Sequence, residues 1–469
     1  MTDAGLMGLI NSSGETLRRG SVRLLVSCEV VVPLLVAIVC TSASATAQFE
    51  PRWSPPRPIP GYAVDIKPPY LVADQNRTIH AFSSQRVEAS LFVFYNQWTL
   101  ARGWTPPVKI LSSPQKDKAT VLGAFLDPDG MIHLIFFGGH EQEAQIYYAR
   151  ARVANADKAR AWTRPRMIGG FAGKLSSGSL TGDRKGNLLV LYSGYRDGNG
   201  LYEVHSTDRG DSWSEPKPAF LTGSMDLWVY GIQATLDDAG RLHVVWDVPN
   251  RAGRAEAAYY ARLEADYEHW SVPVVLATIA ECLYKANWAS ILPLNKELLA
   301  MYNCGAPPHR SMRRSPDRGT TWTSPVVAFR HLIGENGAPV FLVDNRAGAH
   351  VVFSNRSSDS TSHGVYHSEW NGDRWSDPVP IVAGPPGPHF NPGEATGVVS
   401  QGNLLFVTWA QDPGLSGNPV SYSYATLSVP ELPVVAVEGN RPVVKLLAAV
   451  AVLLILSVSL LVQRFRRPA

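Results

Sequence analysis

Aromatic and charged side chains suited to ligand binding lie in the segments between the apolar runs of this chain. Trp228, Tyr230 and Trp288 offer rings on which a sugar or a protein side chain can stack, and Asp226 and Arg86 offer hydrogen-bonding groups. The histidines are scattered without the spacing of metal ligands. We therefore expect a site that binds a glycan or a protein ligand, with neither a metal nor a cofactor.

Composition narrows the class of protein that carries these residues. The chain has 469 residues, and its 43 basic and 40 acidic side chains leave a net charge of only +3. This balance gives no reason to expect a nucleic-acid partner, which would need a clustered basic surface. A hydrophobic content of 45% argues against disorder, and abundant Trp, Gly and Pro with few charges indicates a turn-rich β protein.

A tryptophan-containing tetrapeptide indicates how the binding segments are positioned. The pattern Trp-[Ser/Thr]-x-Pro occurs seven times, at intervals of 51 to 58 residues, and accounts for seven of the 13 tryptophans. Its copies begin at Trp53, Trp104, Trp162, Trp213, Trp270, Trp322 and Trp375. A regular period of about 50 residues is typical of an architecture in which each repeat is one supersecondary unit.

Each repeat also contains a polar turn flanked by alternating apolar residues, which predicts a β-hairpin. A third strand follows the hairpin and the fourth begins at the Trp, so that one repeat predicts a four-stranded propeller blade. Histidine recurs at one place in four of the hairpins, and we interpret these residues as structural: His80, His133, His243 and His350.

The order of these signals predicts a closed all-β ring over residues 48–427. The region begins with a lone Trp53 strand and ends with a hairpin and third strand that lack a fourth. The N-terminal strand can therefore complete the last blade, which gives a seven-bladed β-propeller, with six blades as the alternative. Proline is tolerated in the fourth strand because that strand forms the outer edge of the blade.

Antiparallel topology assigns the loops to two faces. The second-to-third and fourth-to-first connections share one face, where the loops are long and chemically mixed. The short hairpin turns share the other face. We expect function at the long-loop face, around the central mouth of the propeller.

Two repeats resemble the Asp box of sialidase-like propellers, S-x-D-x-G-x-x-W. The matching residues are Ser206, Asp208, Gly210 and Trp213 in one repeat, and Ser315, Asp317, Gly319 and Trp322 in another. We interpret the Asp as structural, because its carboxylate can accept turn N–H bonds while Gly supplies an unusual backbone angle and Trp fills space between sheets. The resemblance covers nearly all of residues 50–427, but the box also occurs in propellers that lack sialidase activity.

Sialidase chemistry, as the resemblance implies it, uses three arginines to hold a carboxylate, a Tyr nucleophile activated by a Glu, and an Asp acid. Lys67 occupies the place of the first arginine, so the forked geometry of arginine is lost. Residues 81–86 resemble a family stretch and keep Arg86, but Glu88 is the only carboxylate near the place of the acid. Tyr230 and Glu335 are the candidate nucleophile and base if the loops bring them together.

Two further arginines, Arg196 and Arg356, follow second strands of later blades and could complete the carboxylate clamp. Solvated loop charges are the alternative interpretation. These departures from the family pattern favour a binding module over an enzyme. A glycoside hydrolase acting on sialic acid or another sugar is the alternative function.

Both ends of the chain resemble membrane-targeting segments. Residues 1–47 combine a basic flank, an apolar run and small residues suited to cleavage, which predicts a secretory signal or, alternatively, an uncleaved anchor. After a linker over residues 428–442, residues 443–463 are nearly all apolar, over a length that spans a hydrocarbon core of about 30 Å. The basic tail over residues 464–469 then predicts a single-pass protein with its propeller outside the cytoplasm.

Two of the four cysteines, Cys282 and Cys304, lie within the predicted propeller. In an oxidising compartment they are candidates for a disulfide, and two buried free thiols are the alternative.

Overall fold

The computed structural model describes residues 51–62, 67–115, 118–139, 144–173, 177–295, 297–387, 390–411 and 420–432. The predicted signal over residues 1–47, the predicted membrane helix over 443–463 and the basic tail lie outside these residues, as does most of the linker. Within the described residues, no helix is long and apolar enough to cross a membrane.

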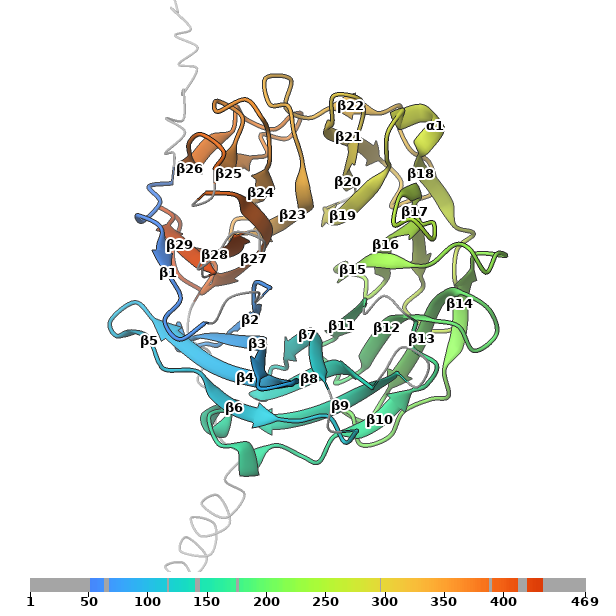
Figure 1. Cartoon of the computed structure of the whole chain (residues 1–469), viewed down its shortest axis with the longest axis vertical. Helices are drawn as coiled ribbons and strands as arrows, with labels where there is room; N and C mark the ends of the chain where they lie inside the picture. The colour runs from blue at the N-terminus through green and yellow to red at the C-terminus, as the bar shows by residue number, and fades with distance from the viewer. Residues whose placement is uncertain are drawn as a thin grey trace, which may run out of the picture. The chain divides into compact units, whose positions relative to one another are not determined.

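Seven antiparallel sheets surround one axis, which confirms the seven-bladed β-propeller and excludes the six-bladed ring (Figure 1). Blade 1 holds β2 (Tyr70–Ala73), β3 (Ile79–Val87), β4 (Ser90–Thr99) and an outer strand split into β5 (Gly103–Trp104) and β6 (Val108–Leu111). Blade 2 holds β7 (Ala119–Leu126), β8 (Met131–Gly138), β9 (Gln145–Arg152) and β10 (Arg166–Gly169). Blade 3 holds β11 (Gly178–Gly182), β12 (Leu188–Gly194), β13 (Gly200–Ser206) and β14 (Lys217–Leu221).

The other four blades repeat this order from the axis outward. Blade 4 holds β15 (Tyr230–Leu236), β16 (Leu242–Pro249), β17 (Ala255–Leu263) and β18 (Val274–Thr278). Blade 5 holds β19 (Asn287–Leu294), β20 (Glu297–Cys304), β21 (His309–Ser315) and β22 (Val326–Val327). Blade 6 holds β23 (Asn336–Val343), β24 (Ala349–Asn355), β25 (Gly364–Glu369) and β26 (Val379–Ala383), and blade 7 holds β27 (Pro392–Ser400), β28 (Leu404–Gln411), β29 (Ser421–Thr426) and β1 (Arg57–Pro58).

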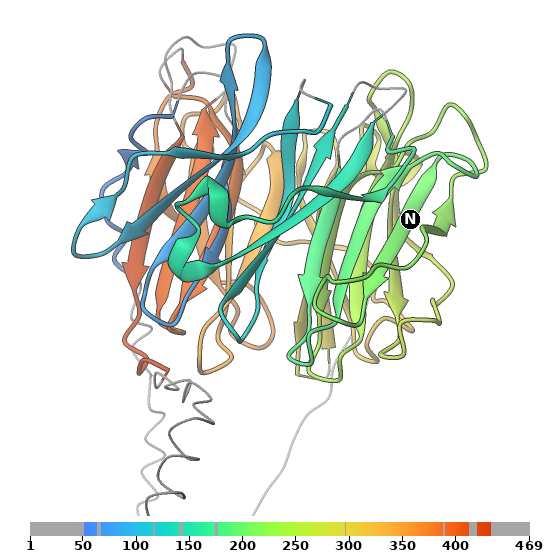
Figure 2. The ribbon, with the colours of Figure 1, turned by 90° about the horizontal axis from the view of Figure 1, so that it is seen from below.

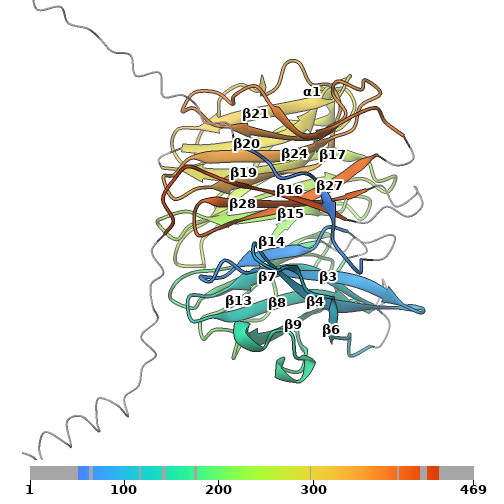
Figure 3. The ribbon, with the colours of Figure 1, turned by 90° about the vertical axis from the view of Figure 1, so that its left-hand side faces the viewer.

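The N-terminal strand completes the last blade, as the order of the repeat predicts. Strand β1 pairs antiparallel with β29, with Arg57 opposite Tyr422. Ile59, which follows β1, donates its N–H to the carbonyl of Val420 at 2.8 Å and is almost fully buried. Blades 1 and 7, blue and red in Figure 3, therefore lie side by side and close the ring.

Each tryptophan of the repeated tetrapeptide packs against the preceding blade. Rings or polar atoms meet across every blade boundary, in the pairs Trp53–His367, Trp104–Tyr422, Trp162–Phe82, Trp213–Tyr148, Trp270–Glu203, Trp322–Tyr260 and Trp375–Met312. These large side chains bury much apolar area at each boundary, so the same residue type holds all seven sheets together.

The Ser or Thr that follows each Trp makes two hydrogen bonds to one residue of the third strand. Thr105, for example, donates its N–H to the carbonyl of Gln97, and its hydroxyl accepts the N–H of the same residue. All seven copies repeat this exchange. The regular outer strand starts later than predicted in most blades, at Arg166 rather than at Trp162 in blade 2. The tetrapeptide is thus a lead-in to the strand.

Aspartates shape the hairpin turns on the face opposite the long loops. The Oδ1 atom of each accepts the N–H four residues later, in Asp74, Asp127, Asp183, Asp237 and Asp344. In blades 1, 2 and 4 the other carboxylate oxygen faces Nε2 of a histidine at 3.2–3.4 Å, and Nδ1 of that ring lies 2.7–2.9 Å from a tyrosine hydroxyl. These Asp–His–Tyr columns give His80, His133 and His243 structural surroundings.

The aspartates of the two repeats that resemble an Asp box form hydrogen bonds within their own turns. Asp208 accepts the N–H of Ser212 at 2.8 Å, and Asp317 accepts the N–H of Thr321 at 2.7 Å. Hydrogen bonds from Ser212 lower the pKa of Asp208 to about 2. Gly210 has a φ of 87°, and a Cβ there would lie 2.1 Å from the hydroxyl of Tyr148. These contacts are structural, and they leave both carboxylates engaged away from the mouth.

Cys282 and Cys304 form a disulfide. Cys282 ends the short helix α1 (Ile279–Cys282), and Cys304 ends β20 of the next blade. Two 3-10 turns, Val153–Asn155 and Ala159–Ala161, are the other helical elements of the described residues. The bridge joins the connection between blades 4 and 5 to the long-loop face of blade 5.

Candidate functional site

The inner strands begin at the long-loop face, and four consecutive ones begin with an irregularity. The register of β15, β19, β23 and β27 shifts within their first residues. Gly231, Trp288 and Gly337 adopt positive φ values of 63°, 54° and 63° there. A bulge of this kind re-aims side chains next to it. We call the residues at these strand starts, together with those leading into β2, the mouth.

Lys67, Glu394 and Tyr230 meet at the mouth although they belong to blades 1, 7 and 4. The ammonium of Lys67 lies 3.7 Å from the carboxylate of Glu394. Protein atoms around Lys67 disfavour its charge, but Glu394 and the hydrogen-bonded Tyr230 hydroxyl outweigh this effect and raise the pKa of Lys67. Water still reaches 68% of the Lys67 side chain and 43% of the Glu394 side chain. The three groups are therefore accessible to a ligand.

Tyr70, the first residue of β2, extends the same group. Nearby protein atoms raise the pKa of Tyr70 to about 12, although 36% of the residue is exposed and the charge of Lys67 opposes the shift. Its hydroxyl therefore stays protonated at neutral pH and can donate a hydrogen bond.

A second group lies at the starts of blades 5 and 6. Lys285 forms an ion pair with Glu335, and its ammonium also lies 4.9 Å from the ring centroid of Trp288. The side chain of Glu335 is 9% exposed, and its Oε2 atom is buried without a hydrogen-bond partner among the described residues. Glu394 packs against Gly337, two residues beyond Glu335, which brings the two groups together.

Arg310 holds the start of β23 in place through hydrogen bonds to backbone carbonyls. Its buried guanidinium donates to the carbonyls of Gly337, Asn336 and Ser354 at 2.8–3.0 Å. Burial lowers the pKa of Arg310 to about 10, against the opposing charge of Glu335.

Asp247 is a carboxyl group that the sequence pattern did not single out. It lies directly opposite Tyr230 in the β15–β16 pair and is 1% exposed. Burial raises its pKa to about 8, although the backbone N–H of Trp288 donates a hydrogen bond to Oδ2 at 2.7 Å. At neutral pH this carboxyl is mostly protonated, and such perturbed groups cluster at functional sites.

The predicted catalytic pair is divided between the two groups of the mouth. Tyr230 is bonded to Lys67, whereas Glu335 is paired with Lys285. Lys67, Trp288 and Arg356 do lie where predicted, and the backbone of Arg356 exchanges hydrogen bonds with that of Glu335. The mouth therefore gathers four of the predicted residues, with Arg356 next to it, and with different pairings from those expected.

The other predicted residues lie away from this pair of groups. Arg86 and Glu88 are exposed near the tip of the long β3–β4 hairpin, light blue in Figure 2, where Arg86 faces the carbonyl of Ala89. Arg196 lies 3.8 Å from Glu215. These long-loop positions do not supply the acid or the clamp that the family pattern requires.

Asp226 and Trp228 belong to the rim of blade 4. Asp226 forms an exposed ion pair with Arg251 at 2.6 Å, and the backbone N–H of Trp228 donates to the carbonyl of Pro249. An open groove lined by Pro307, His309, Val326, Phe329 and Ile333 lies on blade 5 and includes none of the predicted residues. The mouth remains the best candidate site.

Comparison with known proteins supports the fold. No family model matches this chain, and no curated protein does either. An ulvan lyase of polysaccharide lyase family PL25, solved with bound -[GlcA(1-4)Rha3S]-, has a TM-score of 0.53 at 11% identity, over 80% of this chain and 97% of its own. Polysaccharide lyase Uly1 has a TM-score of 0.52 at 9% identity, over 79% of this chain and 91% of its own. These likenesses show a shared propeller architecture.

The sialidase-like resemblance holds only at this coarse level. The NanB sialidase of Streptococcus pneumoniae has a TM-score of 0.44 at 12% identity, over 79% of this chain and 69% of its own. That likeness is too low to assign sialidase residues to this chain. The two lyases act on polysaccharides, and at 11% and 9% identity their likeness to this chain shows the fold alone.

Lys285, Glu394 and Asp247 were missed by the sequence pattern. Glu394 is seventeen residues beyond the nearest preceding acidic residue, Asp377, and Lys285 lies in a mixed loop without a repeat signal. Lys285 lies two residues before the start of the inner strand β19, and Glu394 lies two residues after the start of β27, which is the signal that could have identified them. Asp247 lies in the second strand β16 and becomes visible only through its pairing with Tyr230.

Proposed function

We propose that the mouth binds a glycan, and that anionic glycans are preferred. The carrying observation is the convergence of Lys67, Glu394 and Tyr230 beside Lys285 and Glu335. Carboxylates accept hydrogen bonds from sugar hydroxyls, while ammonium groups donate to acidic substituents. This alternation of donors and acceptors suits a polar, hydroxyl-rich ligand.

Trp288 adds an apolar surface to this polar arrangement. Its side chain is half-buried next to the ammonium of Lys285, and an indole can stack on the apolar face of a sugar ring. The cations at the mouth, including the buried Arg310, outnumber the two glutamates. An anionic sugar would therefore find a favourable local charge.

A glycan array with the purified protein tests this proposal. We expect Lys67→Gln and Trp288→Ala to weaken binding at least about tenfold, since each removes a hydrogen-bonding or stacking group. Arg196→Gln, at an exposed position outside the mouth, is the matched control and should bind as the native protein does. Equal binding by all three variants, or loss in the control alone, would refute the mouth as the binding site.

A second candidate function is cleavage of the bound glycan. It is favoured by Tyr230, whose hydroxyl is bonded to a lysine and whose strand partner is the protonated Asp247. Such a group could accept or donate a proton during bond cleavage. A panel of hydrolase and lyase substrates should then show turnover that Tyr230→Phe abolishes while glycan binding persists. Binding without any turnover would identify a binding module.

We also propose that the propeller lies outside the cytoplasm, tethered by residues 443–463. The apolar length of this segment and the basic tail after it support this orientation. The disulfide between Cys282 and Cys304 suits an oxidising compartment. Labelling of intact cells with an impermeant reagent should modify the propeller, and protection of the propeller would contradict the orientation.

A further inference from the structure

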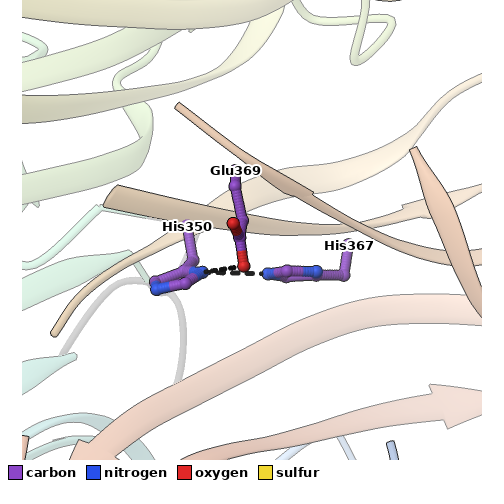
Figure 4. A group of neighbouring side chains, drawn as sticks. All are labelled: His350, His367 and Glu369. Atoms are coloured by element: carbon purple, nitrogen blue, oxygen red, sulfur yellow. Dashed lines mark hydrogen bonds and ion pairs between the residues drawn. The ribbon is translucent and has the colours of Figure 1, made fainter. Parts of the chain in front are cut away.

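Blade 6 contains two histidines and a glutamate whose polar atoms converge (Figure 4). Nδ1 of His350 lies 3.1 Å from Nε2 of His367 and 3.6 Å from Oε1 of Glu369. His350 is directly opposite Glu369 in the β24–β25 pair, and His367 precedes Glu369 by two residues. Because side chains alternate along a strand, all three project from one face of the sheet.

Other blades show what this position holds when it is purely structural. In blades 1, 2 and 4 the residue corresponding to His367 is tyrosine, at Tyr95, Tyr148 and Tyr260. The residue corresponding to Glu369 is Gln97, Arg150 or Arg262. Blade 6 thus replaces a hydroxyl by an imidazole, and an amide or a cation by a carboxylate. Both changes introduce a metal-ligating group at the same point of the repeat.

We propose that His350, His367 and Glu369 bind a divalent first-row transition metal ion such as Zn²⁺, with water as the fourth ligand. Ligand bonds of about 2.0–2.1 Å in tetrahedral geometry place the ligand atoms about 3.3 Å apart. The 3.1 Å and 3.6 Å separations bracket this value, and the three ligand atoms all lie within 4.8 Å of one another. Two imidazoles with one carboxylate also match the ligand preference of zinc.

The surroundings favour a cation. Asp344 lies 3.6 Å from Nε2 of His350, on the ring edge away from the cluster, so that Nδ1 faces His367. At this distance Asp344 contributes its negative charge rather than a hydrogen bond, and carboxylates are common neighbours of metal-ligating histidines. The Glu369 side chain is 24% exposed and leaves a route to solvent.

The site would serve the closure of the ring. Trp53, which leads into the strand that completes blade 7, packs edge-on against His367 with ring centroids 5.4 Å apart. A metal ion that fixes His367 therefore also fixes the surface on which Trp53 rests. The ion would act as a structural element at the boundary between blades 6 and 7, on the strand ends away from the mouth.

Cobalt substitution tests the site in the full chain, purified without a histidine tag. We expect one Co²⁺ per chain with the visible absorption of four- or five-coordinate cobalt, and displacement of that absorption by Zn²⁺. His367→Tyr restores the tyrosine of the other blades and should abolish the absorption. Glu369→Gln, at a partly exposed position, should weaken binding at least about tenfold and serves if His367→Tyr fails to fold. His269→Ala, which removes the exposed histidine beside Asp266, is the control and should keep the site.

Absence of bound Co²⁺ and Zn²⁺ in the native protein would overturn the proposal. So would equal affinity and equal spectra in the native protein and in both blade 6 variants, because the metal would then be bound elsewhere. Loss of the absorption in His269→Ala alone would assign the ion to the surface pair and refute the site equally.

Discussion

Lysine at residue 67 shapes the chemistry available at the mouth. An arginine would present a planar fork to a carboxylate, whereas an ammonium is a compact charge that can be shared among several acceptors. In this protein the Lys67 ammonium is shared by Glu394 and Tyr230. The residue that breaks the family pattern thus becomes the link between blades 1, 4 and 7. Under the proposed glycan-binding function, this change favours a ligand with several scattered acceptors over one defined by a single carboxylate.

The buried Asp247 makes stability depend on pH. Its pKa is about 8 in the folded protein and close to 3.8 in the unfolded chain, so between these values only the folded state holds the proton. The contribution of Asp247 is full below pH 4 and declines as pH rises toward 8, by about 1.4 kcal/mol per pH unit. Urea unfolding at pH 5, 6 and 7 should show Asp247→Asn gaining stability relative to the native protein as pH rises.

Asp238→Asn is the matched control, because Asp238 is exposed in a hairpin turn of the same blade. We expect its stability to follow that of the native protein across the same pH range. A constant difference between native protein and Asp247→Asn would mean that Asp247 is ionised in the folded state, and the proton-donor role suggested for it would fall with that result.

At the scale of the strand, the repeated tetrapeptide stabilises the blade through the hydroxyl of its Ser or Thr as well as through its tryptophan. The Ser or Thr side chain accepts a third-strand N–H at the point where the chain turns into the outer strand. Proline two residues later lacks an N–H, so this part of the edge has few backbone groups to offer a further strand. The motif therefore joins blade to blade and also ends the sheet.

Removal of one such hydroxyl should lower stability without changing shape. Thr105→Val keeps the volume but leaves the N–H of Gln97, in a half-buried region, without its acceptor at 3.0 Å. We expect a loss of about 1 kcal/mol in the free energy of unfolding, measured by urea titration. Thr426→Val, at an exposed position of β29, should change it by less than about 0.5 kcal/mol. Equal effects would show that the hydroxyl is dispensable.

At the scale of the whole molecule, stability depends on the contact between the two ends of the propeller. A single short strand, β1, supplies the outer edge of blade 7, and Trp53 before it contacts blade 6. The ring is closed by noncovalent contacts, since the disulfide lies within blades 4 and 5. Loss of this closure would expose the edge of β29 and the apolar side of blade 7.

Ile59→Ala tests the closure. Ile59 is 1% exposed, so its truncation should lower the free energy of unfolding by about 2–4 kcal/mol. Ile333→Ala removes the same atoms from a side chain that is 41% exposed and should cost much less. Thermal unfolding of the two variants gives the comparison. A similar midpoint for both would show that the closing strand contributes little to the fold.

The number of blades could be predicted because each blade carries the same short sequence signals. Seven tryptophans at a regular period and one hairpin per period specify where each sheet begins and ends, and the lone Trp53 signature specifies how the ring closes. Each of these features depends on residues within a few positions of one another, or on a simple count. Signals of this kind can be recognised in the sequence without knowledge of contacts between distant residues.

The site could be predicted only in part because its residues are distant in sequence. Lys67 and Glu394 are more than 300 positions apart in the sequence. The predicted couple of Tyr230 and Glu335 does not form because Tyr230 interacts with Lys67, whereas Glu335 forms an ion pair with Lys285. Likewise, the spacing of His350, His367 and Glu369 matches no metal motif, because a strand pair brings them together.

The amino-acid sequence by itself determined the blades, their order and the face that carries the long loops, since repetition and strand alternation are local properties. Only the tertiary structure decided which charges share the mouth, which carboxyl is buried beside Tyr230, and which three side chains converge in blade 6. The physical reason is ring closure, because it places strand ends from the whole chain around one axis, where partners are chosen by distance and burial.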